Sequence, residues 1–272
     1  MNRGNDRPAV HFLLSLIEQE DAAVVRHRLG IGEPEQLTAD VAGKWLDGLR
    51  PPKSALLWML EEDDPAINQV VFHYADTLDV TRRDILRGVP FGGARGVLPT
   101  LVRAEEPQVL VSPRGVVAGL REARTIKTAR SAARVVGQQD WAVLAEADLD
   151  EPLPGYARWA LTERADCPGE VRAQFGSHVK FTRRVREAGV VEPAEYAEQT
   201  KPARQVLGVL HFGRQLFPRR TREAAAVLAP LVRDEIGVDP DSWAVMAQLL
   251  PTFLGTVAEL VHTSAAVAHA GR

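Results

Sequence analysis

The sequence has a single cysteine, Cys167, and no long apolar segment free of proline and glycine. One thiol cannot form an internal disulfide, so we expect a fold without disulfide bonds and a cytoplasmic location, where thiols stay reduced. The segment closest to a membrane span, 242–258, is uncharged but contains Pro251 and Gly255. A spanning helix usually needs about 20 mostly apolar residues. We therefore expect a buried helical hairpin at the C-terminus and no membrane partner. The first 21 residues lack the apolar run of a signal peptide.

The sequence also lacks the common motifs of nucleotide, zinc and nucleophile sites. It contains no GxxxxGKS/T, HExxH, paired CxxC or GxSxG pattern. Of its seven histidines, only His262 and His269 return to one helix face, and this pair has no third ligand. Cys167 precedes Pro168 at an expected helix start, where the helix dipole favours a thiolate, but no histidine is recognisable as its base. We expect no cofactor, no metal and no catalytic residue, and we interpret Cys167 as a structural thiol.

Helical periodicity dominates what is present. Near the N-terminus the apolar residues form one helical stripe, made of Phe12, Leu13, Leu16 and Ile17. Strand-like alternation is almost absent, and only PQVLVSP, residues 107–113, would pass as a short strand. Prolines and glycines recur every ten to twenty residues and divide the chain into short helices. This pattern predicts an all-α fold.

Each tryptophan is followed by a proline six to eleven residues later. The pairs are Trp45 with Pro51, Trp58 with Pro65, Trp141 with Pro152, Trp159 with Pro168 and Trp243 with Pro251. Proline fits the first turn of a helix, and an acid before it can cap the free N–H groups. We therefore expect each unit to be an apolar helix, a polar corner and a proline-started helix, with the indole as the wedge that packs one helix on the next.

Two of these units resemble known helical repeats. The stretches LLWMLEEDDPAINQVVFHYADTLDVTRRDIL, 56–86, and ALTERADCPGEVRAQFGSH, 160–178, are similar to the units of HEAT-like repeats and, more closely, of the leucine-rich-repeat variant. The resemblance covers about a fifth of the chain, and the spacing of the units is irregular. It implies irregular stacked helical hairpins, which bury together what one hairpin cannot bury alone. A plain irregular α-helical domain is the alternative.

A glycine-rich loop divides the helical pattern. The expected organisation is an N-terminal helical lobe at 1–90, the loop at 91–99 and a helical-repeat-like lobe at 100–272, unless the chain is one continuous domain. The sequence GGARG in this loop lacks the lysine and hydroxyl residue of a phosphate-binding loop. We therefore interpret the loop as a joint between lobes.

Charge alternates in blocks along the chain, and two blocks are basic. Residues 101–140 hold seven basic and four acidic side chains, and residues 171–222 hold eleven and four. The first block reads as one helix that starts at Ser112 and Pro113, with its cations on one side and an apolar stripe on the other. The candidate binding residues are Arg121, Arg124, Lys127, Arg130 and Arg134 in this block, and Lys180, Arg183, Arg184 and Arg186 in the second.

These features favour a non-catalytic binding or scaffold protein whose basic helical surface meets a macromolecular partner. We expect that partner to be a protein, because helical arrays form extended binding surfaces. Two alternatives stay open: a DNA- or RNA-binding protein that contacts phosphates through the same cations, and an enzyme on a helical scaffold. Either block could instead be a solvated face whose cations pair with neighbouring acids. The oligomeric state stays open.

Overall fold

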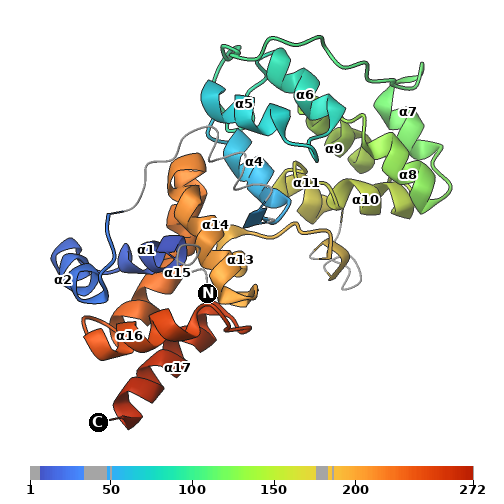
Figure 1. Cartoon of the computed structure of the whole chain (residues 1–272). Helices are drawn as coiled ribbons and strands as arrows, with labels where there is room; N and C mark the ends of the chain where they lie inside the picture. Colours follow the sequence, from blue (N-terminus) through green and yellow to red (C-terminus); the bar gives the residue numbers. More distant parts are fainter. Residues whose placement is uncertain (1–6, 34–47, 50, 176–182, 186, 272) are drawn as a thin grey trace. The chain divides into compact units, whose positions relative to one another are not determined.

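Helices account for all regular secondary structure in residues 7–33, 48–49, 51–175, 183–185 and 187–271, the parts of the chain that the computed structural model describes (Figure 1). The helices before residue 180 are α1 (Arg7–Leu14), α2 (Gln19–Leu29), α4 (Ser54–Leu60), α5 (Pro65–His73), α6 (Asp79–Leu86), α7 (Gly115–Arg121), α8 (Ile126–Ala133), α9 (Asp140–Asp150), α10 (Gly155–Thr162) and α11 (Gly169–Gln174). The later ones are α13 (Pro193–Gln199), α14 (Ala203–Leu216), α15 (Pro218–Glu235), α16 (Pro240–Leu249) and α17 (Val257–Ala270). The predicted all-α class is confirmed. Segment 107–113 is not a strand.

Several helices begin where the sequence supplies a capping side chain or a proline. Asp64 accepts hydrogen bonds from the backbone N–H groups of Ala66 (2.7 Å) and Ile67 (3.2 Å), and Pro65 is the first residue of α5. A carboxylate there satisfies N–H groups that have no partner within the helix. Of the five prolines expected to start a helix, only Pro65 does so. The prediction was wrong at the other four, because α4 begins at Ser54 after Pro51, α10 at Gly155 after Pro152, α11 at Gly169 after Pro168 and α17 at Val257 after Pro251.

Two expected long helices are each divided into two. The first basic block forms α7 and α8, because Thr125 leaves the helical conformation and its hydroxyl accepts from Thr128 N–H in a capping box. The prediction of a single helix was wrong here. The N-terminal stripe spans α1 and the turn before α2, yet its four apolar residues are all buried as expected.

The described contacts divide the chain into two compact units. Unit 1 comprises Met1–Pro51 and Glu192–Arg272, and unit 2 comprises Pro52–Val191. Unit 1 thus combines the two ends of the chain, and the glycine-rich loop at 91–99, expected as a joint, lies inside unit 2.

Long C-terminal helices form most of unit 1. Helix α14 packs on α1 and on α15, and α15 packs on α13. Helices α16 and α17 pack together, which confirms the expected C-terminal hairpin, and Trp243 of α16 is fully buried with its indole N–H donating to Gly237 O at 3.0 Å. No helix in the described part of the chain is long and apolar enough to cross a membrane.

Unit 2 is built from shorter helices around a core under α8 and α10. These two helices pack closely, and their contact contains small buried residues such as Ala129, Ala133 and Ala157. Small side chains let helix backbones approach each other. Trp141 of α9 completes the core and is 2% exposed.

The glycine-rich loop is bound to the corner between α4 and α5. The carboxylate of Asp63 accepts hydrogen bonds from the N–H groups of Phe91 (2.7 Å), Gly92 (3.0 Å) and Ala94 (2.9 Å). A Cβ atom at Gly92 would lie 1.7 Å from Glu61 O, so only glycine permits this approach. Asp63 therefore takes the N–H groups that a phosphate-binding loop would offer to a ligand.

The tryptophans do not share one environment. Trp58, Trp141 and Trp243 are at most 2% exposed, so their indoles are core residues, and their role as wedges between successive helices stays a prediction. Trp159 on α10 is only partly buried, and Trp45 lies outside the described residues. Trp159 is therefore not the fully buried packing residue that its sequence context predicted.

Candidate partner-binding surface

Three cations on and beside α8 form the exposed part of the first basic block. Arg124, Lys127 and Arg134 are exposed, and their side chains make no hydrogen bond or ion pair with any described residue. Lys127 and Arg134 are two helical turns apart and thus lie on one face of α8, separated by about 20° around the helix axis. Ala129 and Ala133 on the opposite face are buried in the core of unit 2. We call Arg124, Lys127 and Arg134 the α8 ridge.

The other two cations predicted for this block are used within unit 2. Arg121 forms an ion pair with Glu151 (2.7 Å) and donates to Ala147 O at the end of α9. Arg130 forms a two-pronged pair with Glu163 at 2.9 and 3.0 Å. Two of the five cations therefore pair with neighbouring acids, which agrees with the alternative that the block is a solvated face. The three cations of the α8 ridge are unpaired among the described residues.

The second block is only partly described. Lys180 and Arg186 lie outside the described residues. Arg183 pairs with Glu187 at 2.8 Å on an exposed surface, where such pairs add little stability. Arg184 stacks on Trp159, with its guanidinium carbon 3.8 Å from the ring centroid. This cation–π contact explains why Trp159 stays near the surface.

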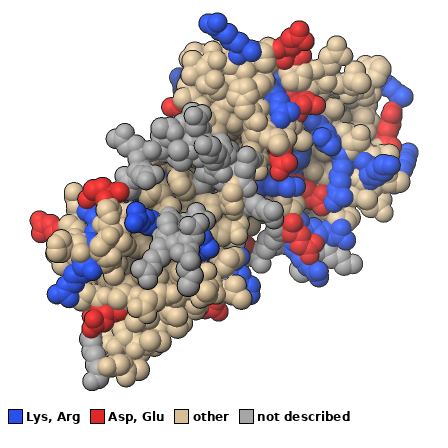
Figure 2. Space-filling view, in the orientation of Figure 1, with Lys and Arg blue, Asp and Glu red and all other residues tan. Residues whose placement is uncertain are grey.

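Residues of both blocks converge on α10. The carboxylate of Glu163 accepts from Arg130 and also from the indole N–H of Trp159 at 2.5 Å. Arg184 covers the same indole. In Figure 2, Lys and Arg side chains over this part of unit 2 are interspersed with Asp and Glu side chains. The two basic blocks therefore meet at α10. There, however, Arg130 is paired with Glu163 and Arg184 is stacked on Trp159.

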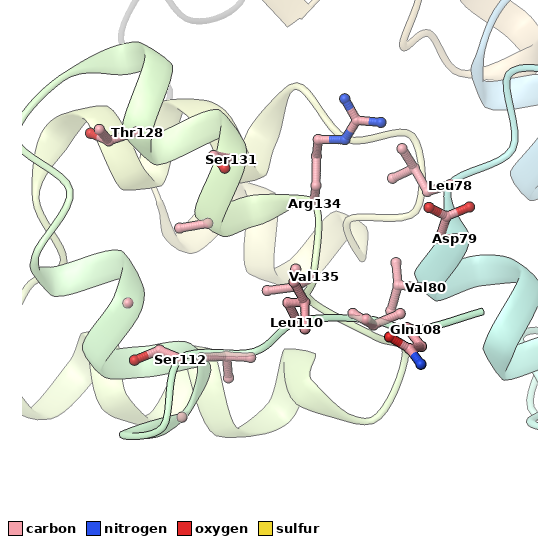
Figure 3. A pocket seen from close by; sticks show the side chains of 15 residues that line it. Leu78, Asp79, Val80, Gln108, Leu110, Ser112, Thr128, Ser131, Arg134 and Val135 are labelled. Carbon is pink, nitrogen blue, oxygen red and sulfur yellow. The ribbon is translucent and has the colours of Figure 1, made fainter. Parts of the chain in front are cut away.

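A groove of about 600 Å³ runs beside the α8 ridge. Figure 3 shows the extended segment from Gln108 to Ser112 along one side of the groove. Thr128 and Ser131 of α8, and Arg134 at the C-terminal cap of this helix, lie on the other side. Leu78 and Asp79, at the start of α6, line the end where Arg134 stands. The carboxylate of Asp79 is paired with Arg82 at 3.2 Å.

The wall formed by the extended segment is unusually apolar for a surface. Leu110, which is 85% exposed, and Val109, which is partly buried, both line the groove. This groove is the feature that the sequence-based reasoning missed. The available signal was a strand-like segment, PQVLVSP, between two prolines in a helical chain with no second segment to pair with.

Among the residues that the structure describes, the titratable groups elsewhere do not combine into a recognisable catalytic arrangement. Burial raises the pKa of the Cys167 thiol to about 12, so the thiol stays protonated near neutral pH, and it is 1% exposed. Burial in unit 1 lowers the pKa of His211 to about 4 and also lowers the pKa of the adjacent His11, whose ring centroid is 5.9 Å away. Within the described residues, no group of three or more His, Cys, Asp or Glu side chains could hold a metal ion.

Comparison with known proteins adds no family to this description. No family model, no curated protein and no solved structure matches the chain. The resemblance to HEAT-like and leucine-rich-repeat-variant arrays therefore stays a prediction, and the function has to be argued from the residues alone.

Proposed function

We propose that the protein is a non-catalytic binding module that holds an acidic protein partner through the α8 ridge of unit 2. The observation that carries this proposal is the contrast between cations of one block. Arg121 and Arg130 are paired inside unit 2, whereas Arg124, Lys127 and Arg134 are exposed without a partner among the described residues. Unpaired cations on a rigid helix attract acidic surfaces and direct their approach.

The surroundings of the ridge favour a protein over a nucleic acid. The exposed apolar side chain of Leu110 and the partly buried Val109 line the adjoining groove, and Glu122 and Glu163 reduce the positive charge around the ridge. A phosphate backbone is bound best by a continuous basic surface. Apolar contacts with charged residues at their edge are typical of protein interfaces.

The proposal is tested by capture from host lysate with three forms of the full chain. One is the unaltered protein, one is the ridge variant Arg124→Gln/Lys127→Gln/Arg134→Gln, and one is the control variant Arg28→Gln/Lys201→Gln/Arg222→Gln, which removes three exposed cations from unit 1. We expect one or more acidic proteins to be captured by the unaltered and control forms, after nuclease treatment and at low salt, and lost with the ridge variant.

Two results would count against the proposal. If nuclease abolishes capture and the ridge binds single- or double-stranded nucleic acid with a steep salt dependence, the partner is a nucleic acid. If the ridge variant captures the same proteins as the unaltered form, the α8 ridge is a solvated face.

A further inference from the structure

Residues 103–111 form an extended segment whose backbone is left open. Within the described residues, no backbone N–H or C=O group of this segment takes part in a hydrogen bond. Its part from Gln108 to Val111 has the composition of a strand, and its exposure alternates over 107–110, with Pro107 and Val109 partly buried and Gln108 and Leu110 exposed. An extended segment with open N–H and C=O groups can pair with another strand.

The groove beside this segment has room for such a strand. Its volume of about 600 Å³ lies between Gln108–Ser112 and α8, and the lining residues on the helical side include Gly119, Ser131 and Ala132, whose side chains are small or absent. At about 3.3 Å per residue, the four residues from Gln108 to Val111 offer a pairing edge of roughly 13 Å.

The charge at the rim of the groove selects the side chains of the incoming strand. Arg134 lines the groove, and Lys127 lies on the same face of α8 two turns away. Asp79 is the acid that lines the groove, and its charge is balanced by Arg82. Carboxylates on the incoming strand would therefore meet two unpaired cations.

We propose that this groove binds an extended acidic segment of a partner protein, which pairs its backbone with Gln108–Val111 and places carboxylates against Lys127 and Arg134. The inference rests on the proposed function, since it specifies how the α8 ridge holds its partner. Main-chain hydrogen bonds supply affinity in such strand addition, and alternate side chains supply specificity.

The test uses a fluorescein-labelled octapeptide of alternating Glu and Val with the full chain. Fluorescence anisotropy measures its affinity, and hydrogen exchange measures the protection of amides 108–111. We expect saturable binding with new protection at these amides, and an affinity at least about tenfold lower for the Arg134→Gln variant. The control variant Arg222→Gln, in unit 1, should bind as the unaltered chain does.

Two further peptides separate the inference from the proposed function. An octapeptide with N-methyl groups on every amide has no N–H donor on either strand edge; if it binds as tightly, strand addition is wrong while an acidic ligand for the ridge stands. An alternating Lys–Val octapeptide reverses the charge; equal binding of this peptide contradicts the proposed function as well.

Two more results would overturn strand addition. One is the absence of binding by the Glu–Val peptide at millimolar concentration, in which case lysate capture by the ridge variant decides the proposed function separately. The other is a dimer in sedimentation velocity with amides 108–111 already protected, since a second copy of the chain would then occupy the segment.

Discussion

The two units bury different kinds of residue. The buried charged side chains of the described residues, Asp84, Asp148, Arg164 and Asp166, all lie in unit 2. Unit 1 buries uncharged polar groups such as Thr221 and Ser242, together with His11. The two units also differ in their longest helices: α14, α15 and α17 of unit 1 have 14, 18 and 14 residues, whereas the described helices of unit 2 have 6 to 11.

Short helices need partners for a larger share of their backbone. The last four carbonyl groups of any helix lack an N–H donor within it, so many short helices expose many carbonyls. In unit 2, arginine side chains supply donors: Arg82 donates to Phe72 O at 3.0 Å and Tyr74 O at 2.9 Å, and Arg121 donates to Ala147 O at 3.1 Å. The planar guanidinium suits this task because it can donate to several oxygens at once.

The largest expected effect comes from Arg164, whose guanidinium donates to Ala133 O, to Val136 O at 2.6 Å and to the carboxylate of Asp166. Arg164→Met leaves this buried acid and Val136 O without their donor, while Ala133 O keeps the bond from Val136 N–H (3.2 Å). We therefore expect a loss of about 3–5 kcal/mol in the free energy of unfolding of unit 2. Urea unfolding followed by hydrogen exchange measures each unit separately.

A matched change in unit 1 sharpens the contrast. Arg233 donates to Leu16 O at 2.9 Å, and Arg233→Met removes this bond without stranding a buried acid. We expect a loss of about 1 kcal/mol in unit 1. Equal losses in the two units would contradict the view that they depend on polar networks to different degrees.

The next effect is the pH dependence of unit 1. The pKa of His211 is about 4 in the folded state against 6.5 in an unfolded chain, because its burial disfavours the charged form, with the cations His11 and Arg214 adding to the effect. The unfolded state therefore binds more protons between these values, and unit 1 loses up to about 3 kcal/mol as the pH falls from 6.5 to 4.

The His11→Gln/His211→Gln variant should remove most of this dependence. His11 also has a lowered pKa, from burial and from Arg26, Arg7 and Arg214, which outweigh Glu33. Thermal unfolding at pH 7 and pH 4.5 measures the effect. An unchanged pH dependence in the variant would assign it to carboxylates instead.

A smaller effect is expected at the glycine-rich loop. Asp63→Ala removes the acceptor of three backbone N–H groups, so we expect a loss of about 1–2 kcal/mol and faster hydrogen exchange at Phe91, Gly92 and Ala94. Asp63→Asn keeps one side-chain oxygen and tolerates the positive φ of 52° at this position, so it should recover part of the loss. Equal exchange in both variants would mean that the loop is held by other contacts.

The smallest effect on stability is expected at the α8 ridge. Arg124, Lys127 and Arg134 are exposed and unpaired among the described residues, so the triple Gln variant should change the free energy of unfolding by less than about 0.5 kcal/mol. Circular dichroism during urea unfolding measures this. A loss of several kcal/mol would show that the ridge stabilises unit 2 rather than staying available for a partner.

The sequence predicted what local chemistry determines. Helical periodicity gave the all-α class, Asp64 with Pro65 gave the start of α5, and the uncharged stretch at 242–258 gave the C-terminal hairpin. The break at Thr125 was missed because a threonine can lie within a helix or cap one, and the sequence does not show which conformation its backbone adopts.

Contacts between residues far apart in the chain could not be predicted from the sequence. The pairing of the chain ends in unit 1, the binding of the loop by Asp63, and the loss of Arg121 and Arg130 to distant acids all join residues 28 or more positions apart. Charge counts along the chain cannot separate a cation that faces Glu163 from one that faces solvent. The sequence therefore predicted only the region of the candidate site. The structure shows which cations of the first block, Arg124, Lys127 and Arg134, are unpaired among the described residues.

The most direct test of the account is the affinity of a captured, purified acidic partner for three forms of the full chain. These are the unaltered protein, the ridge variant at Arg124, Lys127 and Arg134, and the unit 1 control at Arg28, Lys201 and Arg222. The account predicts that the dissociation constant rises at least about tenfold for the ridge variant and stays unchanged for the control. Equal dissociation constants for all three forms would contradict it.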